Sequence, residues 1–364
     1  MDARVVRAAA ASFGRAVAAL ARIVALAVVA ALAVSALAAH AASGSPPAAP
    51  AAAAVRGPVV VYSGRIEALV GPILQTFQRS TGIAVRVRYG DTAELASTLL
   101  EEGPRSPADV FFAQDAGALG AVAAAGLLET LPPSILQRVE PRFRSPRGLW
   151  VGISGRARVV AYSTQRVRPE ELPDSILDFT HPRWRGRIGW PPTNGSFQAF
   201  VTALRKTAGE ETARRWLLGI KANGARAYRN NVAILQAIAD GEIDVGFVNH
   251  YYLYRFLAER GPSFPVRNYH PRAGDAGAMV NVAGVGVLRT APHREAALRL
   301  VEFLLSPEAQ SYFARETYEY PLVAQAPPPQ GLVPLAQLRT PDIDLGDLAD
   351  LQATLNLLWE TGVL

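Results

Sequence analysis

The stretch Val59-Val60-Val61-Tyr62-Ser63-Gly64 decides the fold class of this chain. Its β-branched residues predict a buried strand that ends at Ser63-Gly64. Apolar side chains over 66–80 then recur at the spacing of an amphipathic helix. The alternation continues with predicted strands at 83–89 and 108–112 and predicted helices at 91–102 and 117–125. Strands that alternate with helices form parallel βαβ units, so we expect an α/β fold.

A second run of this alternation follows from about residue 175 to 269, after two predicted strands at 149–153 and 158–162. We therefore expect two α/β lobes joined by a hinge, with a ligand cleft between them that closes by hinge motion. The predicted boundaries place 58–155 and 277–324 in lobe 1 and 156–276 in lobe 2. Residues 325–364 are expected to form a Pro-rich connector and helices that pack on a lobe.

The N-terminus is predicted to direct export. Four arginines precede an almost uncharged run over 23–39, and Ala39-His40-Ala41 has the small-residue spacing of a cleavage site. We expect 1–42 to be a signal peptide, cleaved near Ala41, and 43–57 to be an Ala/Pro-rich linker. The apolar run approaches the length of a membrane span, so an uncleaved anchor is the alternative. The expected location is periplasmic or otherwise exported.

Composition excludes several classes of protein. The absence of cysteine rules out a cysteine-linked lipid anchor, thiolate metal sites and disulfides. Removal of residues 1–41, which carry four arginines and one aspartate, lowers the net charge from +6 to +3. That mild charge, without a polybasic block, argues against a nucleic-acid partner. No motif of a hydrolase, zinc protease, nucleotide-binding loop or dinucleotide site is present, so we do not expect an enzyme.

Polar residues gather where predicted strands end and helices begin. The run Asn249-His250-Tyr251-Tyr252 follows the strand-like segment 244–248 and precedes the helical segment 253–260. The comparable strand ends are Ser63-Gly64-Arg65, Gln114-Asp115, Thr193-Asn194-Gly195-Ser196 and Asn230-Asn231. Each alone is explained as a helix cap. Together, at the edge where open α/β sheets bind ligands, they predict a common polar cleft.

Two adjacent tyrosines in that cleft predict a metal site. Phenolates are hard oxygen donors suited to a trivalent cation, and a bound cation displaces the phenol proton. From the residues alone, the alternative is that Tyr251 and Tyr252 pack a surface or line an ordinary pocket. Arg65 lies unfavourably at a helix N-terminus, which favours an anion beside it. Arg158 is expected to be structural, and Arg156 to be either structural or part of the anion surface.

The chain resembles the bacterial ferric-ion-binding proteins, the bilobal iron receptors of ABC importers, from Val59 to about Ala324. The motifs that carry the resemblance are Val61-Tyr62-Ser63-Gly64-Arg65, Arg105-Ser106-Pro107-Ala108-Asp109-Val110-Phe111-Phe112, Ser154-Gly155-Arg156-Ala157-Arg158-Val159-Val160, Pro192-Thr193-Asn194-Gly195-Ser196-Phe197, Asn249-His250-Tyr251-Tyr252 and Glu319-Tyr320-Pro321-Leu322. The resemblance implies a type II periplasmic-binding-protein fold. It also implies a monomer that delivers iron to an ABC permease and its ATPase.

The resemblance also implies the ligands. Iron(III) would be held by Tyr251 and Tyr252, and a synergistic anion, carbonate or phosphate, would complete the coordination. The positions that match the family's anion-binding residues are Gly195, Ser196, Asn231 and Asn249. Some members also use the arginine equivalent to Arg65 to hold carbonate.

The chain departs from the family at several metal-ligand positions. Ile66 stands where many members carry a histidine, and Gln114 stands where they carry a glutamate. The third tyrosine of other members, near Phe197, is absent. Gln114, Asp115 and Glu67 are therefore further candidates for ligating the metal or supporting its ligands.

Two rival functions use the same residues. A bilobal receptor for a small anion, such as phosphate or a phosphonate, or for an iron chelate would use Arg65 and the helix ends, and its tyrosines would not be metal ligands. A secreted hydrolase would use Asp115 or His250, but none of the four histidines after Ala41 has a motif neighbour that would orient it.

Overall fold

The computed structural model describes residues 57–323, 326 and 331–364, which fall within one compact unit, Val55–Leu364. The predicted signal peptide, most of the predicted linker and the Pro-rich connector at 327–329 lie outside the described residues. None of the helices in the described part has the length and apolar character needed to cross a membrane.

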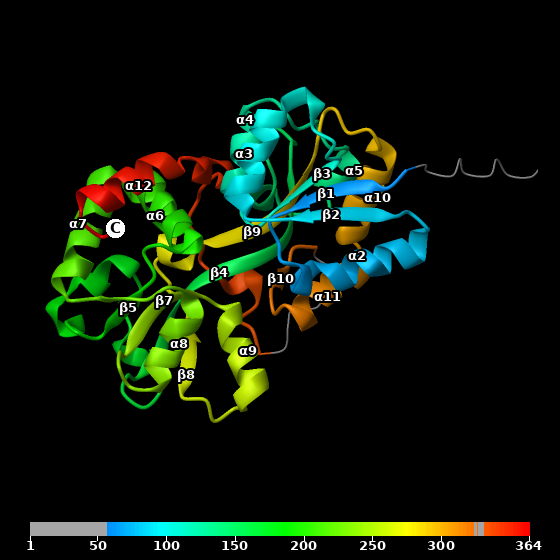
Figure 1. Ribbon diagram of the computed structural model, residues 1–364. Helices are drawn as coiled ribbons and strands as arrows, with labels where there is room; N and C mark the ends of the chain where they lie inside the picture. Colours follow the sequence, from blue (N-terminus) through cyan, green and yellow to red (C-terminus); the bar gives the residue numbers. More distant parts are fainter. Residues whose placement is uncertain (1–56, 324–325, 327–330) are drawn as a thin grey trace, which may run out of the picture. The chain divides into compact units, whose positions relative to one another are not determined.

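The described strands join in one sheet in the order β2-β1-β3-β9-β4-β7-β5-β6, and β8 and β10 also pair with β4 (Figure 1). Their bounds are β1 Val59–Ser63, β2 Val85–Tyr89, β3 Val110–Ala113, β4 Val151–Ser163, β5 Ile188–Trp190, β6 Arg226–Ala227, β7 Val245–Asn249, β8 Val266–Tyr269, β9 Val280–Val287 and β10 Tyr320–Pro321. The strands β1, β2 and β3 are parallel, as are β5, β6 and β7. Each parallel group is the centre of one lobe.

The strand β4 links the two groups. It pairs with β9 and β10 over its first part and with β7 and β8 over its second part. The partner changes at one point, since Ala157 faces β9 and Arg158 faces Asn249 of β7. The prediction of two strands at 149–153 and 158–162 is therefore wrong, because Ser154, Gly155 and Arg156 remain extended and paired with β9. Side chains two residues apart share a face of a strand, so Arg156 and Arg158 point to the same side.

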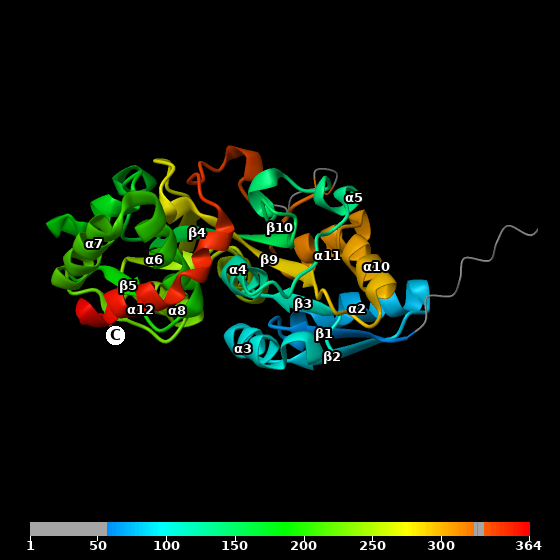
Figure 2. The ribbon, with the colours of Figure 1, turned by 90° about the horizontal axis from the view of Figure 1, so that it is seen from above.

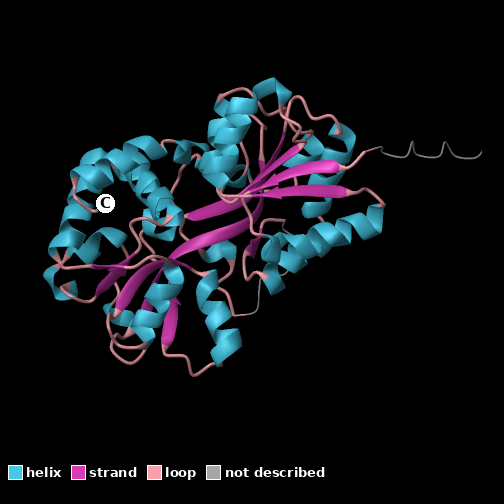
Figure 3. Cartoon of the chain, in the orientation of Figure 1, coloured by secondary structure: helices cyan, strands magenta, loops and turns pink. Residues whose placement is uncertain are grey.

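Helices surround both groups of strands, as Figures 1 and 3 show. Their bounds are α2 Glu67–Thr81, α3 Thr92–Glu102, α4 Ala116–Ala124, α5 Pro133–Leu136, α6 Gly195–Ala208, α7 Glu210–Ala222, α8 Asn231–Ala239, α9 Tyr251–Arg260, α10 Arg294–Leu304, α11 Pro307–Glu316 and α12 Leu351–Glu360. The helices α2, α3 and α4 contact the first group of strands, and α10 contacts β9. The helices α6 and α8 contact the second group, and α9 contacts β8. The predicted α/β class is confirmed.

An aromatic cluster fixes the start of α6. Trp216 lies with its ring centroid 5.3 Å from that of Phe200 and 5.5 Å from that of Phe247. Phe197 in the first turn of α6 meets Trp190, the last residue of β5, edge to face at 5.8 Å. Buried aromatic pairs of this kind stabilise a core beyond the area they bury. The loop between β5 and α6 is therefore anchored at both ends.

The C-terminal segment contacts helices of both lobes, although we expected it to pack on one. Its 3-10 turn Leu345–Ala349 packs on α4, and α12 packs on α6 (Figure 2, red). The hydroxyl groups of Thr354 and Thr202 lie 2.7 Å apart in the buried contact between α12 and α6. Arg205 of α6 donates to the backbone carbonyl of Asp350. The segment therefore spans from one lobe to the other.

Gly120 of α4 allows this close contact. A Cβ atom at this position would lie 2.6 Å from the backbone carbonyl oxygen of Gly346. We expect Gly120→Ala to displace the C-terminal segment and to lower the free energy of unfolding by about 1–3 kcal/mol. Urea denaturation measures this loss, with Ala124→Ser on the exposed side of α4 as the matched control. Equal midpoints for Gly120→Ala and the control would contradict the expectation.

Candidate metal and anion site

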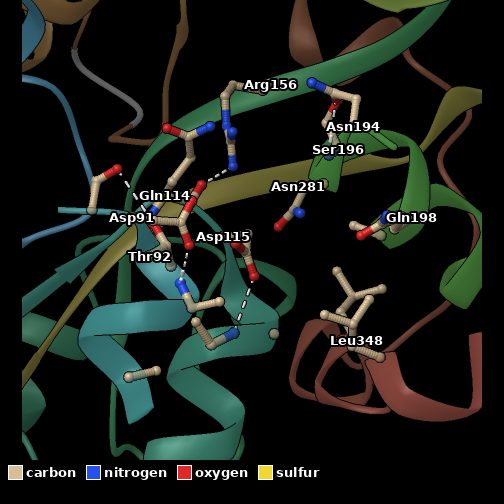
Figure 4. A pocket seen from close by; sticks show the side chains of 18 of the residues that line it. Asp91, Thr92, Gln114, Asp115, Arg156, Asn194, Ser196, Gln198, Asn281 and Leu348 are labelled. Atoms are coloured by element: carbon tan, nitrogen blue, oxygen red, sulfur yellow. Dashed lines mark hydrogen bonds between the residues drawn. The ribbon is translucent and has the colours of Figure 1, made fainter. Parts of the chain in front are cut away.

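A cavity of about 540 Å³ lies where the predicted polar strand ends come together (Figure 4). Lobe 1 contributes Gly64, Thr92, Gln114 and Asp115, and β4 contributes Arg156 and Arg158. Lobe 2 contributes Thr193, Asn194, Gly195, Ser196, Asn249, Tyr251 and Tyr252, and the C-terminal segment contributes Leu348, Ala349 and Leu351. The structure therefore brings most of the predicted site residues to one cavity.

Tyr251 and Tyr252 are the first two residues of α9, which His250 separates from the end of β7. Their rings stack with centroids 4.2 Å apart, and Tyr251 is only 5% exposed. Burial raises the pKa of Tyr251 above its ordinary value, and the neighbouring phenol of Tyr252 raises it further. The phenol of Tyr251 therefore keeps its proton at neutral pH unless a cation displaces it.

His250 fixes the position of this tyrosine pair. It is fully buried, and its Nδ1 accepts a hydrogen bond of 3.0 Å from the backbone N–H of Ala157 in β4. Its Nε2 therefore carries the proton and donates to the carbonyl oxygen of Tyr318 at 2.9 Å. Burial lowers the pKa of His250 to about 3. Because both ring nitrogens are engaged, His250 supports the local structure and leaves no nitrogen free for a ligand or for catalysis.

A ring of hydrogen bonds joins the N-termini of α6, α8 and α9. Arg158 Nη1 donates to Asn249 Oδ1 at 2.9 Å and reaches Ser196 Oγ at 3.4 Å. The backbone N–H of Asn249 donates to Asn231 Oδ1, and Asn231 Nδ2 contacts Asn194 Oδ1. The hydroxyl of Ser196 donates to the same Asn194 oxygen. Helix N-termini held together in this way favour negative charge.

The two arginines of β4 carry charge into the cavity. Arg156 is 3% exposed and donates to the backbone carbonyls of Gln114 and Val282. Arg158 is 2% exposed, and burial lowers its pKa to about 9, so it is charged at neutral pH. Within the described residues, neither guanidinium has a carboxylate in salt-bridge range. Arg158, which we expected to be structural, therefore belongs to the lining of the cavity.

Arg65 is not among the residues that line the cavity. It is 1% exposed, and its Nη2 donates to Glu319 Oε1 at 2.7 Å. The other oxygen of Glu319 accepts from the hydroxyl of Ser154 at 2.6 Å. Nε and Nη1 of Arg65 are buried without a partner in the described part of the chain. The negative charge beside this helix N-terminus is therefore a carboxylate of the chain itself.

The other candidate ligands divide into two groups. Gln114 and Asp115 line the cavity, and Asp115 Oδ1 also caps α4 by accepting from the N–H of Ala118 at 3.0 Å. Glu67 is exposed in the first turn of α2 and is not part of the lining. Over the described ranges, no group of three or more His, Cys, Asp or Glu side chains could hold a metal ion.

Residues 105–345 match the bacterial extracellular solute-binding proteins. The chain belongs to this family. It is 35% identical over 312 residues to the major ferric iron-binding protein of Neisseria meningitidis serogroup B, covering 84% of this chain and 93% of that protein. It is thus a relative of receptors rather than of enzymes.

Solved structures of relatives agree with this assignment. Iron-bound HitA from Pseudomonas aeruginosa has a TM-score of 0.78 and 37% identity, covering 84% of this chain and all of that chain. The Trichodesmium protein IdiA (FutA), solved with iron and citrate ligands, has a TM-score of 0.76 and 32% identity, covering 84% and 99%. The predicted resemblance and the two-lobe type II fold are confirmed.

Several residues that shape the site of this solute-binding protein were not among those predicted from its sequence. Glu319 was noted only as part of a motif, and its partner Arg65 lies 254 positions away. Leu348 and Leu351 add an apolar wall from a part of the chain that we assigned to a connector and helices. Asn281 of β9 also lines the cavity and accepts from the N–H of Ala116. The polar residue in the otherwise apolar strand 280–288 was the available signal for Asn281.

Proposed function

We propose that this protein is an exported receptor that captures iron(III) through Tyr251 and Tyr252 and delivers it to an ABC permease and its ATPase. The observation that carries the proposal is the pair of adjacent phenols in a cavity that also presents buried arginines and helix N-termini. Phenolates are hard donors suited to a hard cation. The relatives named above, a ferric iron-binding protein and an iron-bound structure, support the choice of metal.

A synergistic anion is part of this proposal. The anion would bind at the hydrogen-bonded ring, which contains Ser196, Asn231 and Asn249, and at Gly195, the first residue of α6. Backbone N–H groups at helix N-termini attract anions. Carbonate or phosphate bound there would supply oxygen ligands that this chain's side chains lack. The Trichodesmium relative was solved in complex with both iron and citrate ligands, which supports an anion as a second component.

A visible-light titration tests the proposal. The purified protein is stripped of metal and titrated with ferric nitrilotriacetate, with bicarbonate, with phosphate or with neither. We expect a phenolate-to-iron charge-transfer band that saturates near about one iron per chain and strengthens with the right anion. The absence of a band with every anion would contradict the iron function.

Iron affinity is expected to fall steeply with pH. Each phenol must lose its proton to bind iron, and burial raises the pKa of Tyr251, so protons compete with the metal across the neutral range. Release of two protons per iron corresponds to a loss of about a hundredfold in affinity for each unit of acidification. Competition titrations against a chelator between pH 5 and 8, corrected for the chelator's own protonation, measure the slope. A slope near zero would contradict phenolate ligation.

A receptor for a small anion is the second candidate function. The observation that favours it is that Arg156 and Arg158 are buried without a carboxylate partner in the described part of the chain. Under this function, phosphate binds the metal-free protein tightly, and the charge-transfer band never forms. The iron titration above therefore separates the two candidates.

A further inference from the structure

We propose that the cavity contains a second, apolar subsite for the carbon skeleton of the ligand that accompanies iron, and that this ligand is an aromatic acid with adjacent oxygen donors. The subsite, the apolar wall, is formed by Leu100 of α3, Ala118 and Ala121 of α4, and Leu348, Ala349 and Leu351 of the C-terminal segment. The inference rests on the proposed function in so far as iron and this ligand share one cavity. It goes beyond that function by assigning a ligand to residues that the iron and anion site does not use.

The cavity is larger than a metal ion and an inorganic anion require. Its volume is about 540 Å³, which falls within the ~300–1,000 Å³ of pockets that bury organic ligands. Iron with carbonate displaces only a few times the ~30 Å³ that one water molecule occupies in the liquid. Figure 4 shows Leu348 on the opposite side of the cavity from Arg156. An organic skeleton attached to the anion would reach from the polar strand ends to the apolar wall.

The C-terminal part of the apolar wall is held in place by close packing. Leu348 is only 3% exposed, and a Cβ atom at Gly117 of α4 would lie 2.7 Å from its backbone carbonyl oxygen. Leu351 begins α12, which packs on α6. Leu100 and the three wall residues of the C-terminal segment lie outside residues 105–345, which match the family. Most of the wall therefore comes from parts of the chain other than the stretch that assigns it to the family.

Leu100 presents an uncovered apolar side chain to the cavity. It lies in the last turn of α3 and is 46% exposed. The other exposed large apolar side chains of the described residues do not line the cavity; they are Ile66, Leu218, Val232, Val333 and Trp359. A ligand with an apolar face would cover Leu100 and remove this surface from water, which favours binding.

The chemistry of the apolar wall favours an aromatic skeleton. Its side chains offer no hydrogen bonds, and Asp350 of the same segment is engaged by Arg205 at 3.3 Å and Lys206 at 2.9 Å. A carboxylated skeleton such as citrate would lose hydration at this wall without gaining hydrogen bonds. An aromatic ring has flat apolar faces, and oxygen donors on its edge can ligate a hard cation. The buried Arg156 and Arg158 across the cavity complement the charge of those oxygens.

A matched pair of dianions tests the apolar wall without iron. Phthalate and maleate carry the same two neighbouring carboxylates, and only phthalate has a ring. Calorimetric titrations of the metal-free protein are made at a pH where both are dianions. We expect phthalate to bind at least about tenfold more tightly than maleate, with a more negative change in heat capacity.

Two leucine variants locate the binding of the ring. We expect Leu100→Ser and Leu351→Ser each to lower phthalate affinity about three- to tenfold and to change maleate affinity by less than about twofold. Leu218→Ser is the matched control, because Leu218 on α7 is 45% exposed and lies outside the lining. It is expected to bind both dianions as the wild type does. Circular dichroism melting checks the fold, and Leu100→Ser alone decides if Leu351→Ser is unstable.

The outcomes separate this inference from the iron function. The apolar subsite is overturned if neither dianion binds, if maleate binds as tightly as phthalate, or if the folded leucine variants keep the phthalate affinity of the wild type. Each of these results leaves the charge-transfer band of the iron titration free to form. If the wild type prefers phthalate through the two leucines but shows no band, the iron function fails and the apolar subsite stands.

Discussion

Replacement of both Tyr251 and Tyr252 by phenylalanine is expected to abolish iron binding. The change removes two phenol oxygens and keeps the two stacked rings, so the packing at the start of α9 is preserved. Loss of a group that merely supports a metal ligand costs ~10–100-fold in affinity, so loss of two direct ligands should exceed about a thousandfold. Competition with nitrilotriacetate and the visible spectrum measure the loss.

Tyr254→Phe is the matched control for this double variant. Tyr254 lies on the same helix, and its hydroxyl donates to the carbonyl oxygen of Gly331 rather than facing the cavity. We expect Tyr254→Phe to keep the charge-transfer band and the iron affinity. A double variant that still forms the band with wild-type affinity would show that the tyrosines pack the cavity without binding the metal.

Replacement of Arg65 by methionine is expected to lower the free energy of unfolding by about 3–5 kcal/mol. The reason is that Glu319, fully buried 2.7 Å from Arg65, would be left as an unpaired buried charge with only Ser154 as a donor. Urea denaturation measures the loss. The double variant Arg65→Met/Glu319→Met removes both charges and should recover most of the stability.

The same variants test the role that the family resemblance implies for Arg65. If Arg65 holds the anion, Arg65→Met lowers anion affinity and leaves stability almost unchanged. If its partner is Glu319, stability falls and anion binding by the folded protein persists. Phosphate titration of the folded variants at low temperature separates the two outcomes.

Local signals in the sequence were sufficient for much of the fold. Apolar periodicity placed helices such as α2 and α3 within a residue or two of their bounds. The pattern failed at Ser154-Gly155-Arg156, because glycine and polar residues are typical of a turn, whereas pairing with β9 keeps the segment extended. Pairing with β9 is a tertiary contact, which a short stretch of sequence does not reveal, and it makes β4 one continuous strand.

The outline of the candidate site could also be predicted from local signals. Strand ends in α/β folds meet at one edge, so Tyr251, Asn249 and Ser196 could be grouped before their geometry was known. The pairing of Arg65 with Glu319, and the placing of Arg158 in the cavity, depend on contacts between residues far apart in the chain. Hinge closure, the lobe boundaries, the monomeric state and signal cleavage stay predictions.

Resonance Raman spectroscopy of the iron-loaded protein tests the central claim most directly. Excitation within the visible band should enhance the ring vibrations of tyrosinate bound to iron, and these should shift when the protein is made with ring-deuterated tyrosine. Their presence in the wild type and absence from Tyr251→Phe/Tyr252→Phe is the result we predict. A band without tyrosinate vibrations would contradict iron binding by the tyrosine pair.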